Sequence, residues 1–190
     1  MAMHDEKILV LVGMPGAGKS TCVDYLVSKG IPSVYFGGVV VDETQRRYGK
    51  VNEELEKSVR EELRTKEGKG AIATRIIAKI EQLVQEGNHR IVADGLYSWT
   101  EYKIFKERWG DQAIIVAIVA PRHVRHERLA NRPVRPFTDA EVTQREYNEI
   151  EGIEKGGPIA NADYTIVNNA TAEDLLQQFN AVLTEIGFLK

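Results

Sequence analysis

The 190-residue sequence predicts an α/β fold of three layers, in which a five-stranded parallel sheet lies between two layers of helices. Short apolar runs at residues 7–12, 33–36, 90–93, 113–119 and 164–167 alternate with segments of helical periodicity. The run 113–119 is apolar at every position, as expected for a strand buried on both faces of a parallel sheet. Neighbouring strands joined through helices are parallel, so one sheet accounts for all five runs.

A glycine-rich segment follows the first strand and opens the first helix. Residues 13–20 read G-x-x-x-x-G-K-[ST], the phosphate-binding loop that defines the P-loop NTPase fold. Lys19 is expected to contact the β- and γ-phosphates of ATP, and the Ser20 hydroxyl to ligate Mg²⁺. A glycine-rich turn that binds nothing is the alternative, which the flanking strand and helix disfavour. The expected nucleotide contacts are Gly13, Pro15, Gly16, Ala17, Gly18, Lys19, Ser20 and Thr21.

The second strand, at 33–36, is expected to end at Gly37 and Gly38. A long polar helical region then follows from about Val39 to Glu86, with a break at residues 68–70. Two apolar stripes at helical spacing are expected to face the core. They consist of Leu55, Val59 and Leu63, and of Ile72, Ile76, Ile80 and Leu83.

The third strand, at 90–93, runs directly into Asp94 and Gly95. Ligands of parallel sheets bind beyond the carboxyl ends of the strands, so Asp94 should lie near the phosphate loop. An acid there can hold Mg²⁺ or its waters, although a turn signal is the alternative. Ser98 and Glu101 then form a capping box for a helix that ends near Gly110.

A basic helix is expected from about Arg122 to Asn131, after the fourth strand at 113–119. Pro133 and Pro136 then form an irregular link, and Thr138 caps a further helix that ends before Gly156. The helix from Arg122 begins a cluster of arginines that would suit a closing segment over a phosphoryl group. A solvated basic face is the alternative. The cluster comprises Arg122, Arg125, Arg128, Arg132 and Arg135.

After the last strand, at 164–167, Thr171 is expected to cap the final helix. Two further cations, Arg145 and Lys155, follow Thr138 in the sequence. Contact with phosphate is one interpretation of both, and solvation at the surface is the simpler one.

The arginines of the helical region suggest what the protein phosphorylates. Arg46, Arg47, Arg60, Arg64 and Arg75 lie within 39–86, together with a single aromatic residue. This set favours an acceptor that carries phosphate, because arginine binds phosphate through two parallel hydrogen bonds. A surface pair with Glu56, four residues earlier, explains Arg60 equally well.

Composition excludes several classes of protein. The net charge of −3 argues against a general nucleic-acid-binding surface. No apolar run approaches the length of a membrane span, and the first residues lack the regions of a signal peptide. The single Cys22 cannot form an internal disulfide. We therefore expect a cytoplasmic protein, a monomer or homodimer, with no membrane or nucleic-acid partner.

The chain resembles the nucleoside-monophosphate-kinase-like P-loop kinases, which include adenylate kinase and dephospho-CoA kinase. It resembles most closely a mainly archaeal group described as adenylate-kinase-related or dephospho-CoA-kinase-like. Besides the phosphate loop, the resemblance is carried by residues 60–64, 92–95, 125–129 and 162–168. It covers nearly the whole chain.

The resemblance implies a single P-loop kinase domain over 1–190. Its core would be 1–38, 87–121 and 156–190, with an acceptor-binding region at about 39–86 and a lid at about 122–155. The cofactors implied are ATP and Mg²⁺. The roles implied are phosphate binding by Lys19, acceptor contacts by Arg60 or Arg64, lid roles for Arg128 and Arg132, and adenine contact by Asn168, for which a turn-forming role is the alternative. Together with the analysis of the residues, this gives Lys19, Asp94, Arg128 and Arg132 as the expected catalytic residues and Arg60, Arg64 and Arg125 as the expected acceptor contacts.

One departure from the family pattern leaves the acceptor open. Related kinases often carry Gly-Asp after the second strand, whereas this chain has Gly37-Gly38 followed by three valines up to Val41. The leading hypothesis is transfer of the γ-phosphoryl group of ATP to a nucleoside monophosphate. Dephospho-CoA is the second acceptor, and a slow ATPase acting as a nucleotide-dependent switch is the alternative of another class.

Overall fold

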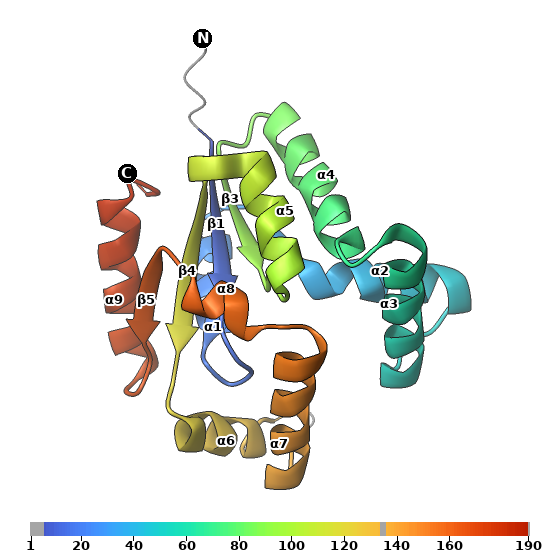
Figure 1. Ribbon diagram of the computed structural model, residues 1–190. Helices are drawn as coiled ribbons and strands as arrows, with labels where there is room; N and C mark the ends of the chain where they lie inside the picture. The colour runs from blue at the N-terminus through green and yellow to red at the C-terminus, as the bar shows by residue number, and fades with distance from the viewer. Residues whose placement is uncertain (1–5, 134–135, 190) are drawn as a thin grey trace.

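The computed structural model describes residues 6–133 and 136–189 and shows the three-layer α/β/α fold that the sequence predicts. All five strands are parallel and lie in the order β2-β3-β1-β4-β5 (Figure 1). Because β1 is central, the segments that follow β3, β1 and β4 meet at one edge of the sheet. The strands are β1 Lys7–Val12, β2 Ser33–Tyr35, β3 Arg90–Asp94, β4 Ala113–Val119 and β5 Tyr164–Val167.

The side chains of β1 alternate between two buried clusters, one on each face of the sheet. Ile8, Val10 and Val12 pack toward α2, α4 and α5, whereas Leu9 and Leu11 pack toward α1 and α9. A strand covered on both faces must be apolar at every position, which explains the run seen in the sequence. The covering helices are α1 Lys19–Ser28, α4 Ala71–Gln85, α5 Trp99–Trp109 with the 3₁₀ turn η1 Gly110–Gln112, and α9 Ala172–Glu185.

The helical region consists of α2 (Phe36–Tyr48), α3 (Glu53–Glu67) and α4, which stand to one side of the sheet in Figure 1. The expectation that Gly37 and Gly38 end the second strand is wrong. The strand stops at Tyr35, and both glycines lie inside α2. A Cβ at Gly37 would stand 2.4 Å from the ring of Tyr35. Glycine therefore permits the close approach of this ring, which is half-exposed.

The segment after β4 begins with α6 (Arg122–Ala130) and α7 (Asp139–Tyr147). Instead of one helix up to Gly156, α7 gives way to the π-helical turn η2 (Asn148–Gly152), and α8 (Gly156–Ala160) follows. Pro158 is compatible with α8 because it lies in the first turn, where a helix needs no N–H donor. Arg135 lies outside the described residues.

Three helix starts are confirmed by their hydrogen bonds. Ser98, Thr138 and Thr171 each accept from the backbone N–H three residues later, and an acid at that position binds back to the cap. Within the described part of the chain, no helix is long and apolar enough to cross a membrane.

A buried carboxylate joins the three helices of the helical region. Glu43 of α2 is only 8 % exposed and accepts hydrogen bonds from Arg46 and Arg47 at 2.6–2.9 Å. Arg47 continues to Glu62 of α3 at 2.7 Å, and Arg75 of α4 lies 4.0 Å from Glu43. The hydrogen bonds from Arg46 and Arg47 lower the pKa of Glu43 to about 2.

This lowered pKa makes part of the stability dependent on pH. The contribution of Glu43 is complete above its ordinary pKa of 4.5 and is lost as the pH falls toward 2. We expect Glu43→Gln to reduce the free energy of unfolding at pH 7 by about 1–3 kcal/mol, because it removes hydrogen bonds to a charged group. The difference from wild type should shrink in acid. Urea unfolding at pH 7 and at pH 3 measures both effects.

Glu81→Gln is the matched control, since Glu81 pairs with the half-exposed Arg108 at 2.6 Å. Exposed pairs of this kind contribute at most about 1 kcal/mol. A variant at Glu43 that is no less stable than the control would contradict the structural role of this carboxylate.

Candidate functional site

The phosphate loop connects β1 to α1 at the carboxyl edge of the sheet. Gly18 precedes α1 in a left-handed conformation, with φ of 105°, and no side chain caps the N-terminus of this helix. The first N–H groups of α1 are therefore available to an anion, which the helix dipole also favours. The Lys19 ammonium donates to the Gly13 carbonyl at 2.8 Å, which holds it over the loop.

Lys19 is buried among other charges. Its burial, and then the charge of Lys155, lower its pKa to about 8, while the carboxylates of Asp94 and Glu149 act in the opposite direction. A bound phosphate would stabilise the charged form of this ammonium, because its negative charge replaces the solvation by water that burial removes.

The phosphate loop packs against two neighbouring segments so closely that Gly16 and Gly18 have no room for a side chain. A Cβ at Gly16 would stand 2.7 Å from the Arg125 carbonyl oxygen, and one at Gly18 would stand 2.3 Å from the amide nitrogen of Asn168. Asn168 is 4 % exposed, and its amide donates to the Ala17 carbonyl at 2.7 Å. The motif glycines thus allow α6 and the β5–α9 connection to touch the loop backbone.

Arg128 of α6 joins the same segments. Its guanidinium donates to the Asn168 side chain at 3.2 Å, to the Asn168 and Ala170 carbonyls at 3.3 Å, and to the Gly16 carbonyl at 3.5 Å. Arg128 therefore lies beside the loop. Arg132, one turn further along, is exposed and has no hydrogen bond or ion pair with any residue that the structure describes.

Arg125 is directed into the protein instead of into an open cleft. It is 8 % exposed, its guanidinium pairs with Glu146 of α7, and it donates to the Ala120 carbonyl at 3.1 Å and the Pro15 carbonyl at 3.5 Å. The expected acceptor contact at Arg125 has no support in this geometry. The residue links α6 to α7 and to the phosphate loop.

Asp94 is the last residue of β3 and pairs in register with Leu11 of β1, so it lies beside the loop as expected. Burial raises its pKa, and the nearby Lys19 and Lys155 partly offset this. Within residues 6–133 and 136–189, its carboxylate accepts no hydrogen bond. No cluster of three metal-ligating side chains occurs in that part of the chain. Mg²⁺ needs only one or two protein oxygens when phosphates and waters complete its shell, so Asp94 and Ser20 fit it.

The sequence analysis left Lys155, Glu149 and Tyr97 out of the expected site, and the structure brings the three together beside the loop. Lys155, which solvation was expected to explain, is 3 % exposed. Its ammonium pairs with Glu149 and lies 4.9 Å from the ring centre of Tyr97. No local pattern reveals this, because the preceding turn η2 and a left-handed Glu154, with φ of 58°, direct Lys155 inward.

The arginines of the helical region divide into two groups. Arg46, Arg47 and Arg75 are engaged by Glu43, Glu62 and Glu67, so they cannot be counted as free donors for a ligand. Arg60 and Arg64 are one turn apart on α3. Arg60 has no hydrogen bond or ion pair within the described part of the chain, which leaves its charge for a ligand.

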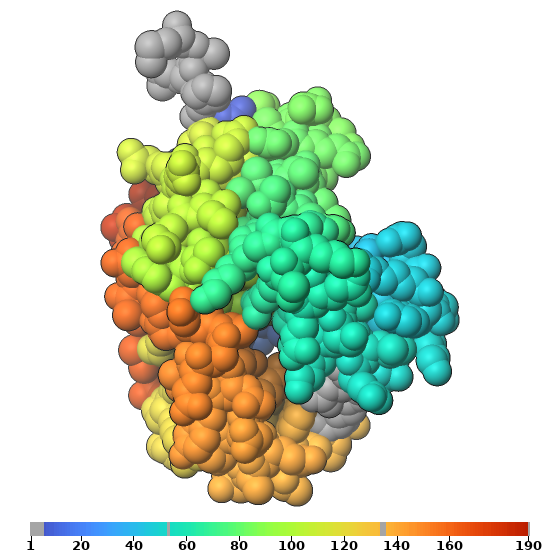
Figure 2. Space-filling model, turned by 45° about the vertical axis from the view of Figure 1, so that its right-hand side comes forward, coloured from blue at the N-terminus to red at the C-terminus, as the bar shows by residue number. Residues whose placement is uncertain are grey.

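Arg64 lines a hollow of about 270 Å³ between α3, the start of α5 and the end of η2. Its Nη2 lies 3.7 Å from the Glu101 carboxylate, and its Nε is buried without a partner among the described residues. Lys69 adds a second cation. In Figure 2 the surface is hollowed between the teal of α3 and the orange of the α7–α8 segment. The remaining lining residues are Thr65, Ser98, Thr100, Gly152, Ile153 and Glu154.

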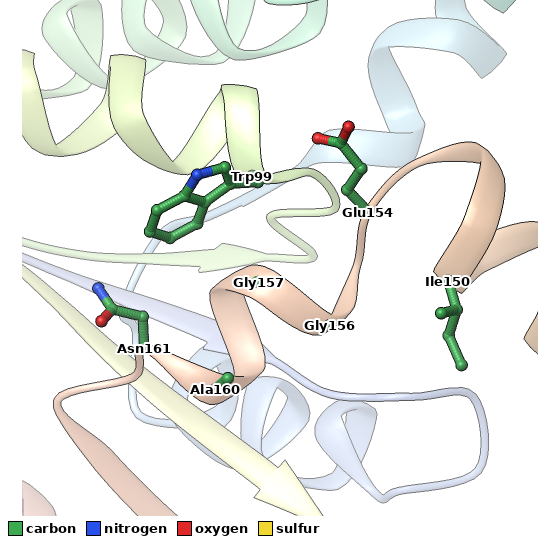
Figure 3. A pocket seen from close by; sticks show the side chains of 7 residues that line it. All are labelled: Trp99, Ile150, Glu154, Gly156, Gly157, Ala160 and Asn161. Atoms are coloured by element: carbon green, nitrogen blue, oxygen red, sulfur yellow. The ribbon is translucent and has the colours of Figure 1, made fainter.

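A second hollow, of about 580 Å³, lies between the start of α5 and the segment that precedes and forms α8. Figure 3 shows Trp99 on one side of it, with Glu154 and Ile150 contributed by the other. Trp99 stacks on Tyr102 at 4.8 Å and contacts Gly157, so it has a packing role. No phosphate-loop residue lines either hollow.

Solved structures of similar fold are P-loop kinases. The chain aligns over its full length with 98 % of a shikimate kinase from Acinetobacter baumannii, at 23 % identity and a TM-score of 0.55. It aligns over 96 % of its length with 98 % of a dephospho-CoA kinase from Campylobacter jejuni, at 16 % identity and a TM-score of 0.53. At these identities the likeness shows the fold, which is that of small-molecule P-loop kinases.

A model of the AAA domain matches residues 9–153. A UPF0200 protein of Thermococcus onnurineus is 34 % identical over 94 % of this chain and 97 % of its own length. A UPF0200/UPF0201 protein of Archaeoglobus fulgidus is 33 % identical over 96 % of this chain, which spans 57 % of that protein. The chain therefore belongs to the UPF0200 protein family.

Proposed function

We propose that the protein transfers the γ-phosphoryl group of ATP to an anionic small molecule, namely a nucleoside monophosphate. One observation carries the proposal. The uncapped N-terminus of α1, the buried Lys19 and the unbonded Asp94 carboxylate meet at one edge of the sheet. This combination binds and polarises a phosphate chain and supports phosphoryl transfer.

Each part of the site has a distinct role in this reaction. The loop N–H groups and Lys19 bind the β- and γ-phosphates and stabilise the charge that spreads over the transferring group. Ser20 and Asp94 hold Mg²⁺, which supplies further neutralisation of that charge. Arg128 and Asn168 hold the β5–α9 connection against the loop, where the nucleotide base would lie, and Arg132 is free to approach the phosphates.

Arg60 and Arg64 are the basis for an anionic acceptor. Two like charges one turn apart destabilise a helix, and Glu101 faces only Arg64. An acceptor carrying phosphate would relieve the repulsion through hydrogen bonds that arginine makes well. The hollow beside Arg64 offers hydroxyl groups and Lys69 but no aromatic platform, so selectivity for a base should be weak.

The division of labour between segments belongs to the same proposal. Residues 39–86 bind the acceptor, and residues 122–155 form a lid that excludes water during transfer. The rival acceptors are dephospho-CoA and, because a shikimate kinase shares the fold, a hydroxylated carboxylate such as shikimate. A slow ATPase that acts as a switch is the alternative without an acceptor.

The kinase assignment is tested first by Lys19. We expect Lys19→Ala to remain folded and to lower the rate of ADP formation from MgATP by roughly 10²–10³-fold, because one aimed charge is removed from the transferring group. A coupled assay of ADP release, with circular dichroism as the check of folding, measures this. Turnover near that of wild type would contradict the role of the loop.

The metal assignment is tested by Asp94→Asn, which removes the charge with little change of shape. We expect activity at limiting Mg²⁺ to fall about 10- to 100-fold, as is usual when a group that holds the metal's waters is lost. Affinity for metal-free ATP should change much less. The rate is measured as a function of Mg²⁺ concentration for both proteins. Identical curves would contradict the metal-binding role and leave Asp94 with a turn-forming role only.

The acceptor site is tested by Arg60→Gln, with Lys57→Gln as the matched control. Lys57 lies on the same helix and is exposed. ADP release should be stimulated by a nucleoside monophosphate and not by the matching nucleoside. Arg60→Gln should raise the KM for this acceptor about tenfold or more, the equivalent of one hydrogen bond to a charged group. The control should leave KM unchanged.

The acceptor panel separates the rivals. Stimulation by dephospho-CoA or shikimate alone would keep the kinase and replace the acceptor. Stimulation by a free nucleoside would contradict the role of Arg60. Steady hydrolysis that no acceptor changes would support the ATPase switch.

A further inference from the structure

The segment from Asn148 to Lys155 has two irregularities that packing alone does not require. Helix α7 widens into the π-helical turn η2, and Glu154 takes a left-handed conformation that is unfavourable for a residue with a side chain. Both kinds of irregularity concentrate at functional sites. Their combined effect is to bring Glu149 and Lys155 together in the interior.

Glu149 holds two cations at once. Its carboxylate accepts from the Arg145 guanidinium at 3.1 Å and pairs with the Lys155 ammonium, while the Lys155 N–H donates to the Glu149 carbonyl at 3.1 Å. The Lys155 side chain is 4 % exposed and that of Glu149 is 14 % exposed. An ammonium so far from water must keep an anionic partner, because an unpaired buried charge is strongly destabilising.

The pair lies within electrostatic reach of the phosphate site. The Lys155 ammonium lies 4.9 Å from the ring centre of Tyr97, and this ring packs against Gly95, the residue after Asp94. In agreement with this placement, the charges of Lys155, Glu149 and Arg145 act on Lys19. The three cations and two carboxylates thus share the region into which the loop directs the end of a bound phosphate chain.

We propose that the Glu149 carboxylate occupies the position that the terminal phosphate of the nucleotide takes on binding. The phosphate then displaces this carboxylate from Lys155 and Arg145. The proposal rests on the proposed function only in that ATP is the ligand. A phosphate brought beside Glu149 repels it, and both anions satisfy the same two cations. The exchange therefore keeps Lys155 paired in both states and delivers two further cations from the lid to the phosphoryl group.

Glu149→Gln tests the exchange through the sign of its effect. If Glu149 competes with phosphate, the variant should bind tripolyphosphate and a non-hydrolysable ATP analogue more tightly, by about tenfold, the equivalent of one charge-assisted hydrogen bond. If Glu149 only positions Lys155, binding should weaken. Isothermal titration calorimetry at fixed Mg²⁺ and ionic strength gives the affinities, and circular dichroism verifies folding.

Four further variants, one of them a double variant, complete the experiment. Glu151→Gln, an exposed carboxylate of the same turn, should change neither affinity. Lys155→Ala should weaken binding and abolish the gain from Glu149→Gln in the double variant, because the two substitutions are then coupled. Glu149→Asp is the substitute if Glu149→Gln fails to fold, because it keeps the negative charge. Its shorter side chain pairs less well with Lys155, so the gain in phosphate affinity should be smaller.

The outcomes separate the exchange from the kinase activity. Tighter binding that depends on Lys155 supports the exchange even if no acceptor is ever phosphorylated. Weaker or unchanged binding in Glu149→Gln overturns it even if the kinase assay succeeds. Absence of tripolyphosphate and analogue binding in every form of the protein overturns it together with the nucleotide site.

Discussion

The shape of the phosphate loop depends on direct contact between its backbone and two other segments. Gly16 touches the backbone of α6, and Gly18 touches the buried amide of Asn168. Any side chain at either glycine would push these neighbours away, and both positions have positive φ values that favour glycine. The loop, the first helix after β4 and the connection after β5 are consequently packed directly against one another, and Arg128 adds four hydrogen bonds between them.

A second consequence concerns the segments that can move. Arg125 binds α6 firmly to the loop and, through Glu146, to α7. The irregular turn and the left-handed Glu154 come only after α7, at the return to the core. Flexibility in the proposed lid is therefore expected at this return, near Lys155, and not at the start of α6. Glu154 of this return also lines the hollow beside Arg64.

The protein uses its many cations in two physically different ways. Arg46, Arg47 and Arg75 are paired with acids that join α2, α3 and α4, and they stabilise the helical region. Lys19 and Lys155 are instead buried beside the loop, and their burial lowers the pKa of both ammonium groups. In the proposed function, phosphate binding falls to these two buried cations and not to the paired arginines.

The sequence by itself determined what depends on local rules. The five strands, the phosphate loop and the caps at Ser98, Thr138 and Thr171 follow from hydrophobic patterning, glycine conformations and side-chain hydrogen bonds over three residues. Asp94 was also correctly placed, because strand order brings the ends of adjacent strands together.

Only the tertiary structure decided which charges are paired. The partners of Arg125, Arg47 and Lys155 come from other helices or across an irregular turn, so no spacing along the chain predicts them. The same is true of the helix that begins at Phe36, before the two glycines, because Phe36, Val39 and Val40 are buried in the core cluster of β1, α4 and α5. The physical reason is that burial and ion pairing are set by contacts between distant segments, whereas propensities and caps act within one turn.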